Sequence, residues 1–337
     1  MVMVIFSLLA ALWLWPGGLG AGQVAAPPPA PPGDTVRFPY FRVPEGVYLC
    51  GEPVPLDDPA VREDLDRGLT IDIWSRAQTT MWIKRAHRYL PEVEEKLRSR
   101  RMPLDLKYVV IIESDLRPRA RSPVGAAGPW QFMAPTAQRF QLTYNQAVDK
   151  RLEFGEATDA ALSYLQRLYQ LFRDWPLALA AYNCGEARVQ KEMAIQGVNS
   201  FYRLSLPEET ERYVHRLLAA KIVLEDPARY GYEIPADQLY PPLAYDEVSI
   251  TLAKALTVRR LAEACGSYYK ALKTLNPWIK GAELPPGVYR LKLPKGSASR
   301  FQEAWRRGLV AASRKQGAVG RRAGLRGRLS PGRVAQI

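Results

Sequence analysis

The sequence contains few residues of the kinds that bind metals. Among 337 residues there are two His and three Cys, and no two Cys stand as a Cys-x-x-Cys pair. Zinc sites are built from clusters of Cys and His at such short spacings. We therefore expect no metal and no organic cofactor. The odd number of cysteines leaves two arrangements open, one disulfide with a free thiol or three free thiols.

Long apolar runs are also scarce. Residues 2–15 form an almost continuous apolar segment of 14 residues, which is short for a helix that spans a bilayer. Small residues follow Pro16 up to Ala26, as they do after the core of a signal peptide. We expect residues 1–26 to be a signal peptide, with a short membrane anchor as the alternative. The protein is then exported, to the periplasm or the cell envelope.

Strand-like alternation of apolar and polar residues is scarce before residue 245. Leu, Ala and Arg dominate over β-branched residues in the middle of the chain, which favours helices. The apolar run at residues 104–112 fits either a strand or a helix. The fold class that these patterns predict is mainly α. From the spacing of apolar residues, we expect helices at residues 60–87, 90–101, 157–172, 175–183 and 207–225.

Shifts in composition divide the chain into segments. A Pro-rich linker at residues 27–36 precedes a helical segment at residues 37–235 that is long enough for one sizeable core. Residues 245–296 form a separate small α+β module, with two short helices between flanking strands.

A basic tail is expected at residues 305–337. It carries nine basic side chains, no acidic ones and few large apolar residues, so we expect it to be disordered. Such a tail can bind any polyanion. Because the rest of the chain is only mildly basic, we expect no nucleic-acid partner.

Glu113 directly follows an apolar run at residues 108–112. A carboxyl next to five apolar residues is partly desolvated, which raises its pKa and lets it hold a proton near neutral pH. That is the property of a general acid. Taken alone the pattern is common, because a Glu at the end of an element is usually a solvated surface residue.

A loop at residues 125–133 is the second candidate segment. It contains two glycines, which suggest positive φ or a close backbone approach, and it carries an amide, Gln131, and the apolar Met133. The ordinary alternative is a tight turn before a helix that starts near Pro135.

Two helix ends complete the pattern. Tyr182 and Asn183 stand at the C-terminus of a helix, with Gly185 as its cap. Residues 206–214 begin another helix, which carries Tyr213 about two turns in. Each end alone is also typical of an ordinary helix with a core tyrosine.

The order and spacing of these segments resemble the catalytic domain of the lytic murein transglycosylase family, in particular its membrane-bound D type. The family motifs that match are Glu-Ser at Glu113-Ser114, Gly-x-Trp-Gln at 128–131, Ala-Tyr-Asn-x-Gly at 181–185 and Leu-Pro-x-Glu-Thr-x-x-Tyr-Val at 206–214. The resemblance covers roughly residues 39–232. Pro129 and Cys184 depart from the residues usual in the family, but neither removes a catalytic group.

The resemblance implies a lysozyme-like helical catalytic domain, of the goose-type lysozyme and lytic transglycosylase superfamily, that acts on peptidoglycan glycan strands. It implies cleavage of the β-1,4 bond between N-acetylmuramic acid and N-acetylglucosamine, with formation of 1,6-anhydromuramic acid. Glu113 is then the one catalytic residue, first as acid and then as base. The residues implied to hold the substrate are Ser114, Gln131, Met133, Tyr182, Asn183 and Tyr213.

The module at residues 245–296 resembles a LysM peptidoglycan-binding domain. The matching residues are Leu261-Ala262, Gly266, Leu272, Leu275-Asn276-Pro277 and residues 291–294. The alternative is a small helix-and-hairpin cap without affinity for glycans.

Other functions stay open at this point. A hydrolytic muramidase of the goose-type lysozyme kind shares the fold and Glu113 but delivers water to the sugar. A non-catalytic wall-binding protein keeps the fold without cleavage. A nucleic-acid-binding protein depends on the basic tail alone.

Overall fold

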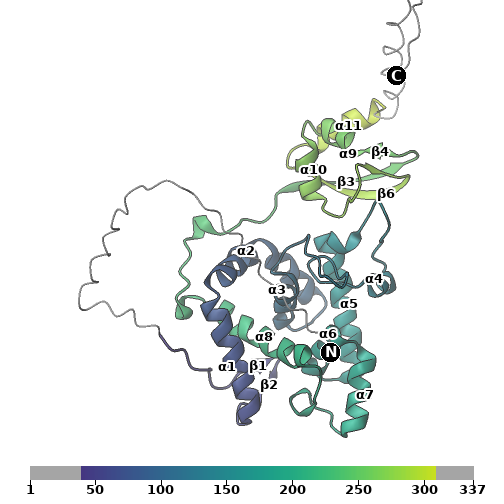
Figure 1. Cartoon of the computed structure of the whole chain (residues 1–337). Coiled ribbons are helices and arrows are strands. Elements are labelled where there is room, and N and C mark those ends of the chain that lie inside the picture. Colours follow the sequence, from purple (N-terminus) through teal and green to yellow (C-terminus); the bar gives the residue numbers. More distant parts are fainter. Residues whose placement is uncertain (1–38, 309–337) are drawn as a thin grey trace, which may run out of the picture. The chain divides into compact units, whose positions relative to one another are not determined.

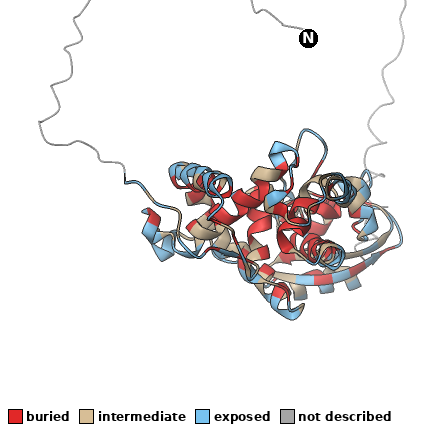
Figure 2. Ribbon diagram, turned by 90° about the horizontal axis from the view of Figure 1, so that it is seen from below, coloured by how far each residue is buried: buried red, intermediate tan, exposed pale blue. Residues whose placement is uncertain are grey.

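The computed structural model describes residues 39–308, so the predicted signal segment, the linker and most of the predicted basic tail lie outside the described residues. Residues 41–308 form one compact unit with two apolar cores. The helices up to α8 surround the larger core, and the C-terminal strands and helices surround the smaller one (Figure 1). Figure 2 shows the buried residues gathered on the central helices. Among residues 39–308, no helix is long and apolar enough to cross a membrane.

The first part of the chain is helical apart from one short hairpin, β1 (Tyr48–Leu49) with β2 (Glu52–Pro53). The helices are α1 (Pro59–Trp74), α2 (Arg76–Ser99), α3 (Val109–Ser114), α4 (Ala134–Arg139), α5 (Phe154–Phe172), α6 (Trp175–Cys184), α7 (Glu186–Gln196) and α8 (Glu208–Glu225). The predicted mainly α fold class is confirmed.

The boundary between the first two helices differs from the prediction. The break lies at Ser75 rather than between residues 87 and 90, and α2 continues through Pro91. Two hydroxyls satisfy the carbonyls that the break leaves free. Thr79 donates to the carbonyl of Asp72 over 2.5 Å, and Tyr232 donates to that of Ile73 over 2.7 Å. These partners come from other segments, so a local pattern does not reveal the break.

The apolar run at residues 104–112 is helical. A short 3-10 helix, Leu104–Tyr108, leads directly into α3. Val109, Val110 and Ile111 are fully buried, so this helix is apolar on all sides because the other helices surround it. That surrounding explains why its composition resembles that of a buried strand.

Helices α1 and α8 pack closely along each other. At their contact stands Gly68, where an added Cβ would lie 3.3 Å from Cβ of Ala219 and 3.4 Å from the carbonyl oxygen of His215. The absence of a side chain at Gly68 lets the two helices approach. Residues of this pair of helices also line a cavity.

The C-terminal part is a small α+β module, as predicted. Its elements are β3 (Tyr245–Leu252), β4 (Leu256–Thr257), α9 (Val258–Ala264), α10 (Tyr269–Leu275), β5 (Glu283–Leu284), β6 (Gly287–Pro294) and α11 (Ala298–Arg306). Strands β3 and β6 pair antiparallel, with Val248 opposite Leu291. Helix α11 includes the first residues of the predicted tail, which was expected to be disordered from residue 305, because Phe301 is buried and Trp305 stacks on it.

Candidate active site

Glu113 lies in the last turn of α3, with its side chain partly exposed. The chain leaves this helix through two residues of left-handed conformation, Asp115 at φ 53° and Leu116 at φ 56°. Such conformations are costly for residues other than Gly and persist where neighbouring contacts fix them. The end of α3 is therefore held from outside the helix.

Asp115 provides this anchor. Its carboxylate accepts hydrogen bonds from Nε1 of Trp82 over 2.8 Å and from Nε2 of Gln78 over 3.0 Å. Its carbonyl accepts a third from Arg85 over 3.0 Å. Asp115 thus ties the end of α3 to α2, and its carboxylate is engaged in that role.

At neutral pH the carboxyl of Glu113 is present in both its protonated and its ionised form. Burial raises its pKa to about 7, against the opposing effects of a hydrogen bond from Tyr213 and of the positive charge of Arg216. Tyr213 donates its hydroxyl to Oε1 of Glu113 over 2.7 Å. A carboxyl with this pKa can donate a proton and take one back in the same turnover.

Tyr182 lies near the same carboxyl. The pKa of its buried hydroxyl is raised well above the usual value, first by burial and then by the charge of Glu113. The hydroxyl donates to the carbonyl of Trp130 over 2.9 Å. The structure therefore brings Glu113, Tyr182 and Tyr213 together from α3, α6 and α8.

The loop at residues 125–133 is held by a close backbone contact. Gly128 has φ +85°, and a Cβ there would lie 1.8 Å from the carbonyl oxygen of Arg151. Gly is thus required at this position for both conformation and space. Trp130 in the same loop is fully buried and donates to Oγ1 of Thr158 over 2.9 Å.

A buried ion pair supports this loop from beneath. Arg151 pairs with both carboxylate oxygens of Asp149, over 2.9 Å and 3.0 Å. It also donates to the carbonyls of Gly125 and Phe132, each over 3.0 Å. Because Asp149 and Arg151 are almost wholly buried, the pair fixes the loop to the start of α5 with little access for water.

The other predicted site residues lie in different environments. Ser114 is buried, and its hydroxyl donates to the carbonyl of Val110 over 3.0 Å. Gln131 is partly buried and donates to the carbonyl of Gly128 over 2.7 Å. Asn183 accepts from Oγ1 of Thr210 over 2.8 Å. Met133 is exposed. Ser114 thus supports α3, and Gln131 in this conformation supports its loop.

Sequence reasoning missed several groups that act on the site. Arg216 and Glu209 both influence the pKa of Glu113. They stand three residues after and four residues before Tyr213, so helical spacing places them on its face of α8. That spacing was available as a signal, whereas nothing in the sequence singles out Asp149 and Arg151 as a buried pair.

The described residues offer no evident metal site. Within residues 39–308, no group of three or more His, Cys, Asp or Glu side chains is arranged to hold a metal ion. All three cysteines, which lie in this range, are free thiols.

Comparison with known proteins identifies a domain that includes Glu113 and Tyr182 but ends before Tyr213. Residues 92–204 match the family model described as Transglycosylase SLT domain. Membrane-bound lytic murein transglycosylase D of Escherichia coli (strain K12) is 33% identical over 234 residues, 68% of this chain and 51% of that protein. A putative tributyltin chloride resistance protein of Alteromonas sp. (strain M-1) is 34% identical over 116 residues, 34% of this chain and 56% of that protein. The chain thus spans about half the length of these curated relatives.

Two solved structures show more distant likeness. An inactive mutant of lytic transglycosylase Slt from Pseudomonas aeruginosa is 19% identical with a TM-score of 0.35, covering 45% of this chain and 26% of that one. The 70 kDa soluble lytic transglycosylase of Escherichia coli is 24% identical with a TM-score of 0.34, covering 46% of this chain and 27% of that one.

Proposed function

Because the chain carries the transglycosylase SLT domain of the lytic murein transglycosylase family, we propose that it cleaves peptidoglycan glycan strands as a lytic transglycosylase. The bond cleaved is the β-1,4 bond between N-acetylmuramic acid and N-acetylglucosamine. The observation that supports this most directly is the carboxyl of Glu113, whose pKa is raised to about 7 and which accepts a hydrogen bond from Tyr213.

Glu113 acts twice in the proposed reaction. Its protonated carboxyl donates to the bridging oxygen as the bond from that oxygen to the anomeric carbon breaks. The substrate's own N-acetyl group stabilises the positive charge that develops there. The carboxylate of Glu113 then takes the proton of the muramoyl C6 hydroxyl, whose oxygen bonds to the anomeric carbon and closes the 1,6-anhydro ring.

The engagement of Asp115 supports a one-carboxylate route. Most glycosidases use two carboxyl groups on opposite sides of the bond. Asp115, the acid nearest to Glu113 in sequence, is bound to Trp82 and Gln78. The roles proposed for Tyr182 and Asn183 are to orient the sugars, whereas Tyr213 positions Glu113.

The products released from purified sacculi test this proposal. We expect muropeptides that are lighter by one water than hydrolytic products, and a loss of roughly 10²- to 10⁴-fold in rate in Glu113→Gln. Glu233→Gln is the matched control, because Glu233 is exposed and takes no part in the site. Reducing ends of full mass would establish a hydrolytic muramidase instead. Absence of any product from the unaltered protein would favour a wall-binding protein.

We further propose that residues 245–296 bind glycan strands as a LysM-like module. In support, Asn276 of the Leu-Asn-Pro segment is buried and joins α10 to β6, donating to the carbonyl of Lys292 over 2.7 Å and accepting from its N–H over 2.9 Å. Tyr268 and Tyr269 are exposed nearby and offer aromatic faces to sugars. Weaker sedimentation with sacculi in Tyr268→Ala, but not in Val288→Ala, is the expected result.

The site of action follows from the substrate. We propose that the protein works in the cell envelope, exported through the segment at residues 1–26, either as a signal peptide or as an anchor. Fractionation of cells that produce the full chain, with detection of the mature N-terminus by mass spectrometry, distinguishes the two.

A further inference from the structure

Asp72 is a buried carboxyl on α1 that none of the proposed catalytic steps uses. It is 5% exposed, and its Oδ2 has no hydrogen-bond partner among the described residues. Burial raises its pKa to about 7, and the positive charge of Arg216 opposes this rise. Because a buried carboxylate without a hydrogen-bond donor is costly, the ionised form of Asp72 depends on that charge.

Arg216 connects this carboxyl with the catalytic one. Helical spacing places Arg216 one turn after Tyr213 on the same face of α8, and Tyr213 donates its hydroxyl to Oε1 of Glu113 over 2.7 Å. The charge of Arg216 lowers the pKa of Glu113, as it lowers that of Asp72. One guanidinium therefore acts on two carboxyls, which belong to α1 and α3.

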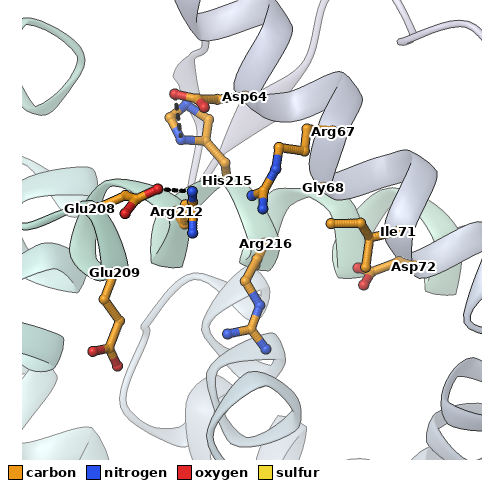
Figure 3. A pocket seen from close by; sticks show the side chains of 10 residues that line it. All are labelled: Asp64, Arg67, Gly68, Ile71, Asp72, Glu208, Glu209, Arg212, His215 and Arg216. Atoms are coloured by element: carbon orange, nitrogen blue, oxygen red, sulfur yellow. Dashed lines mark ion pairs between the residues drawn. The ribbon is translucent and has the colours of Figure 1, made fainter. Parts of the chain in front are cut away.

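Close packing of α1 on α8 fixes this arrangement. An added Cβ at Gly68 would lie 3.3 Å from Cβ of Ala219, so the two helices approach closely there. Asp72 follows Gly68 by one helical turn, and it lines the same cavity of about 350 Å³ as Arg216 does. Figure 3 shows Asp72 on α1 and Arg216 on the neighbouring α8. The backbone positions of both residues are thus set by two packed helices.

Few other charges act on either carboxyl. Glu209, four residues before Tyr213, raises the pKa of Glu113. Tyr232 donates its hydroxyl to backbone carbonyls of α1 and not to the carboxylate of Asp72. The other charged or titratable residues that line the cavity shift neither pKa, and they are Asp64, Arg67, Glu208, Arg212 and His215. Among the described residues, Arg216 is therefore the cation that acts on both carboxyls.

We propose that Asp72 is a positioning residue for the reaction, which acts on Glu113 through the guanidinium of Arg216. The ionised carboxylate of Asp72 attracts this guanidinium toward α1 and offsets part of its charge. Glu113 is then exposed to a smaller positive charge and keeps its proton to higher pH, as a general acid requires. The inference rests on the proposed function, because it concerns the same catalytic carboxyl.

The pH–rate profiles of two variants test the direction of the effect. Asp72→Asn leaves the charge of Arg216 uncompensated, so the alkaline limb of the rate of muropeptide release should move to lower pH. Arg216→Gln removes that charge, so the limb should move to higher pH. We expect each shift to be roughly half a pH unit, the size typical of a partly exposed charge pair. Arg216 is exposed, so Arg216→Gln keeps the test valid if circular dichroism shows that Asp72→Asn does not fold.

The double variant separates an effect through Arg216 from a direct or structural one. In protein that carries Arg216→Gln, adding Asp72→Asn should leave the limb where it is, because no guanidinium remains for Asp72 to offset. Raising the salt concentration from about 0.02 M to about 0.5 M should shrink both single-variant shifts, since ions screen exposed charges. Asp64→Asn is the matched control, because Asp64 lies on the same helix and lines the same cavity without acting on the pKa of Glu113.

Two results would overturn the role of Asp72. One is a limb at the same pH in Asp72→Asn and in the unaltered protein, and the other is a shift that persists in full when Arg216→Gln is also present. Cleavage of sacculi that is lost in Glu113→Gln would still uphold the transglycosylase in either case. If the sacculi are not cleaved at all, an NMR titration of the Glu113 carboxyl, assigned by the loss of its signal in Glu113→Gln, measures the same shifts without turnover.

Discussion

Glu113 has to hold a proton at the start of the reaction and release it during bond cleavage. Because its pKa is raised to about 7, the acid form declines about tenfold for each pH unit above that value, and the rate should decline with it. The hydrogen bond from Tyr213 stabilises the carboxylate of Glu113. Tyr213→Phe should therefore raise the pKa of Glu113 and move the alkaline limb of the pH–rate profile to higher pH. Initial rates of muropeptide release between pH 5 and 9 measure this shift.

The control for this variant is Tyr202→Phe. Tyr202 is also a largely buried tyrosine, but its hydroxyl has no hydrogen-bond partner among the described residues, and the pKa of Glu113 does not depend on it. If the alkaline limb of the pH–rate profile lay at the same pH in Tyr213→Phe as in the unaltered protein, the positioning role of Tyr213 would be contradicted, even if the overall rate fell.

The same carboxyl makes stability depend on pH. The folded state binds the proton of Glu113 more tightly than the unfolded state, whose pKa is near the ordinary value of 4.5. Between these two pKa values stability falls as pH rises, because ionising the partly buried carboxyl costs desolvation energy. Glu113→Gln removes this cost, so its Tm relative to the unaltered protein should be higher at pH 8 than at pH 5. A difference in Tm that is equal at both pH values would refute this.

At this scale the sequence predicted Glu113 and Tyr213, since an apolar run and a spaced motif mark them. It did not predict that Ser114 is buried against Val110 or that Gln131 bonds to Gly128, because side-chain orientation depends on neighbours from distant segments. The sequence also did not predict that Asp72 is buried, because its burial arises where α1 packs against α8.

The loop at residues 125–133 is an element whose shape depends on two glycines. Gly125 at φ +90° and Gly128 at φ +85° have similar positive φ angles, but only Gly128 faces a close neighbour, the carbonyl oxygen of Arg151. Alanine at either position adds backbone strain of about 1–2 kcal/mol. Gly128→Ala also forces this contact apart, which adds a further ~1–3 kcal/mol.

We therefore expect Gly128→Ala to lower the Tm and the cleavage rate more than Gly125→Ala does. Thermal unfolding and muropeptide release on the two purified variants measure both effects. Equal losses in the two variants would show that strain alone, without the contact with Arg151, accounts for the requirement for glycine.

The helices that the sequence predicted were placed more accurately in position than in their ends, and α7 was not predicted. The spacing of apolar residues marks α5, α6 and α8 because each has a clear buried side. The break at Ser75 depends on hydroxyls of Thr79 and Tyr232, and the passage of α2 through Pro91 depends on burial of Leu90 and Val93. Packing outweighs local propensity at both places.

At the scale of the whole described chain, the module and the helical domain share a core. Ala127, Val148 and Leu152 belong to the helical domain, yet they pack in the apolar core of the module. The N–H of Asp149 donates to the carbonyl of Trp278 over 2.8 Å. Since Asp149 holds Arg151, and Arg151 holds the loop at residues 125–133, docking of the module supports the catalytic loop.

One ion pair across this contact allows a test. Nζ of Lys292 in β6 lies 2.5 Å from Oε1 of Glu153, which caps α5, and both side chains are largely buried. Lys292 lowers the pKa of Glu153, against the effect of burial, so the pair stabilises the folded state above the ordinary pKa of a Glu and loses this effect as pH falls through the lowered value. Lys292→Met leaves the buried carboxylate without its ion-pair partner, and we expect a loss of about 3–5 kcal/mol at pH 7.

The loss should shrink toward pH 4, because Glu153 in the variant then takes up a proton. Lys295→Met is the control, since Lys295 is 70% exposed and pairs with Asp246 inside the module, where an exposed pair contributes at most about 1 kcal/mol. Chemical unfolding at pH 4 and pH 7 gives the free energies of unfolding, and the rate of muropeptide release from purified sacculi reports on the loop. If Lys292→Met is less stable but equally active, the module stabilises the fold without supporting the loop, and the link through Asp149 and Arg151 is not functional.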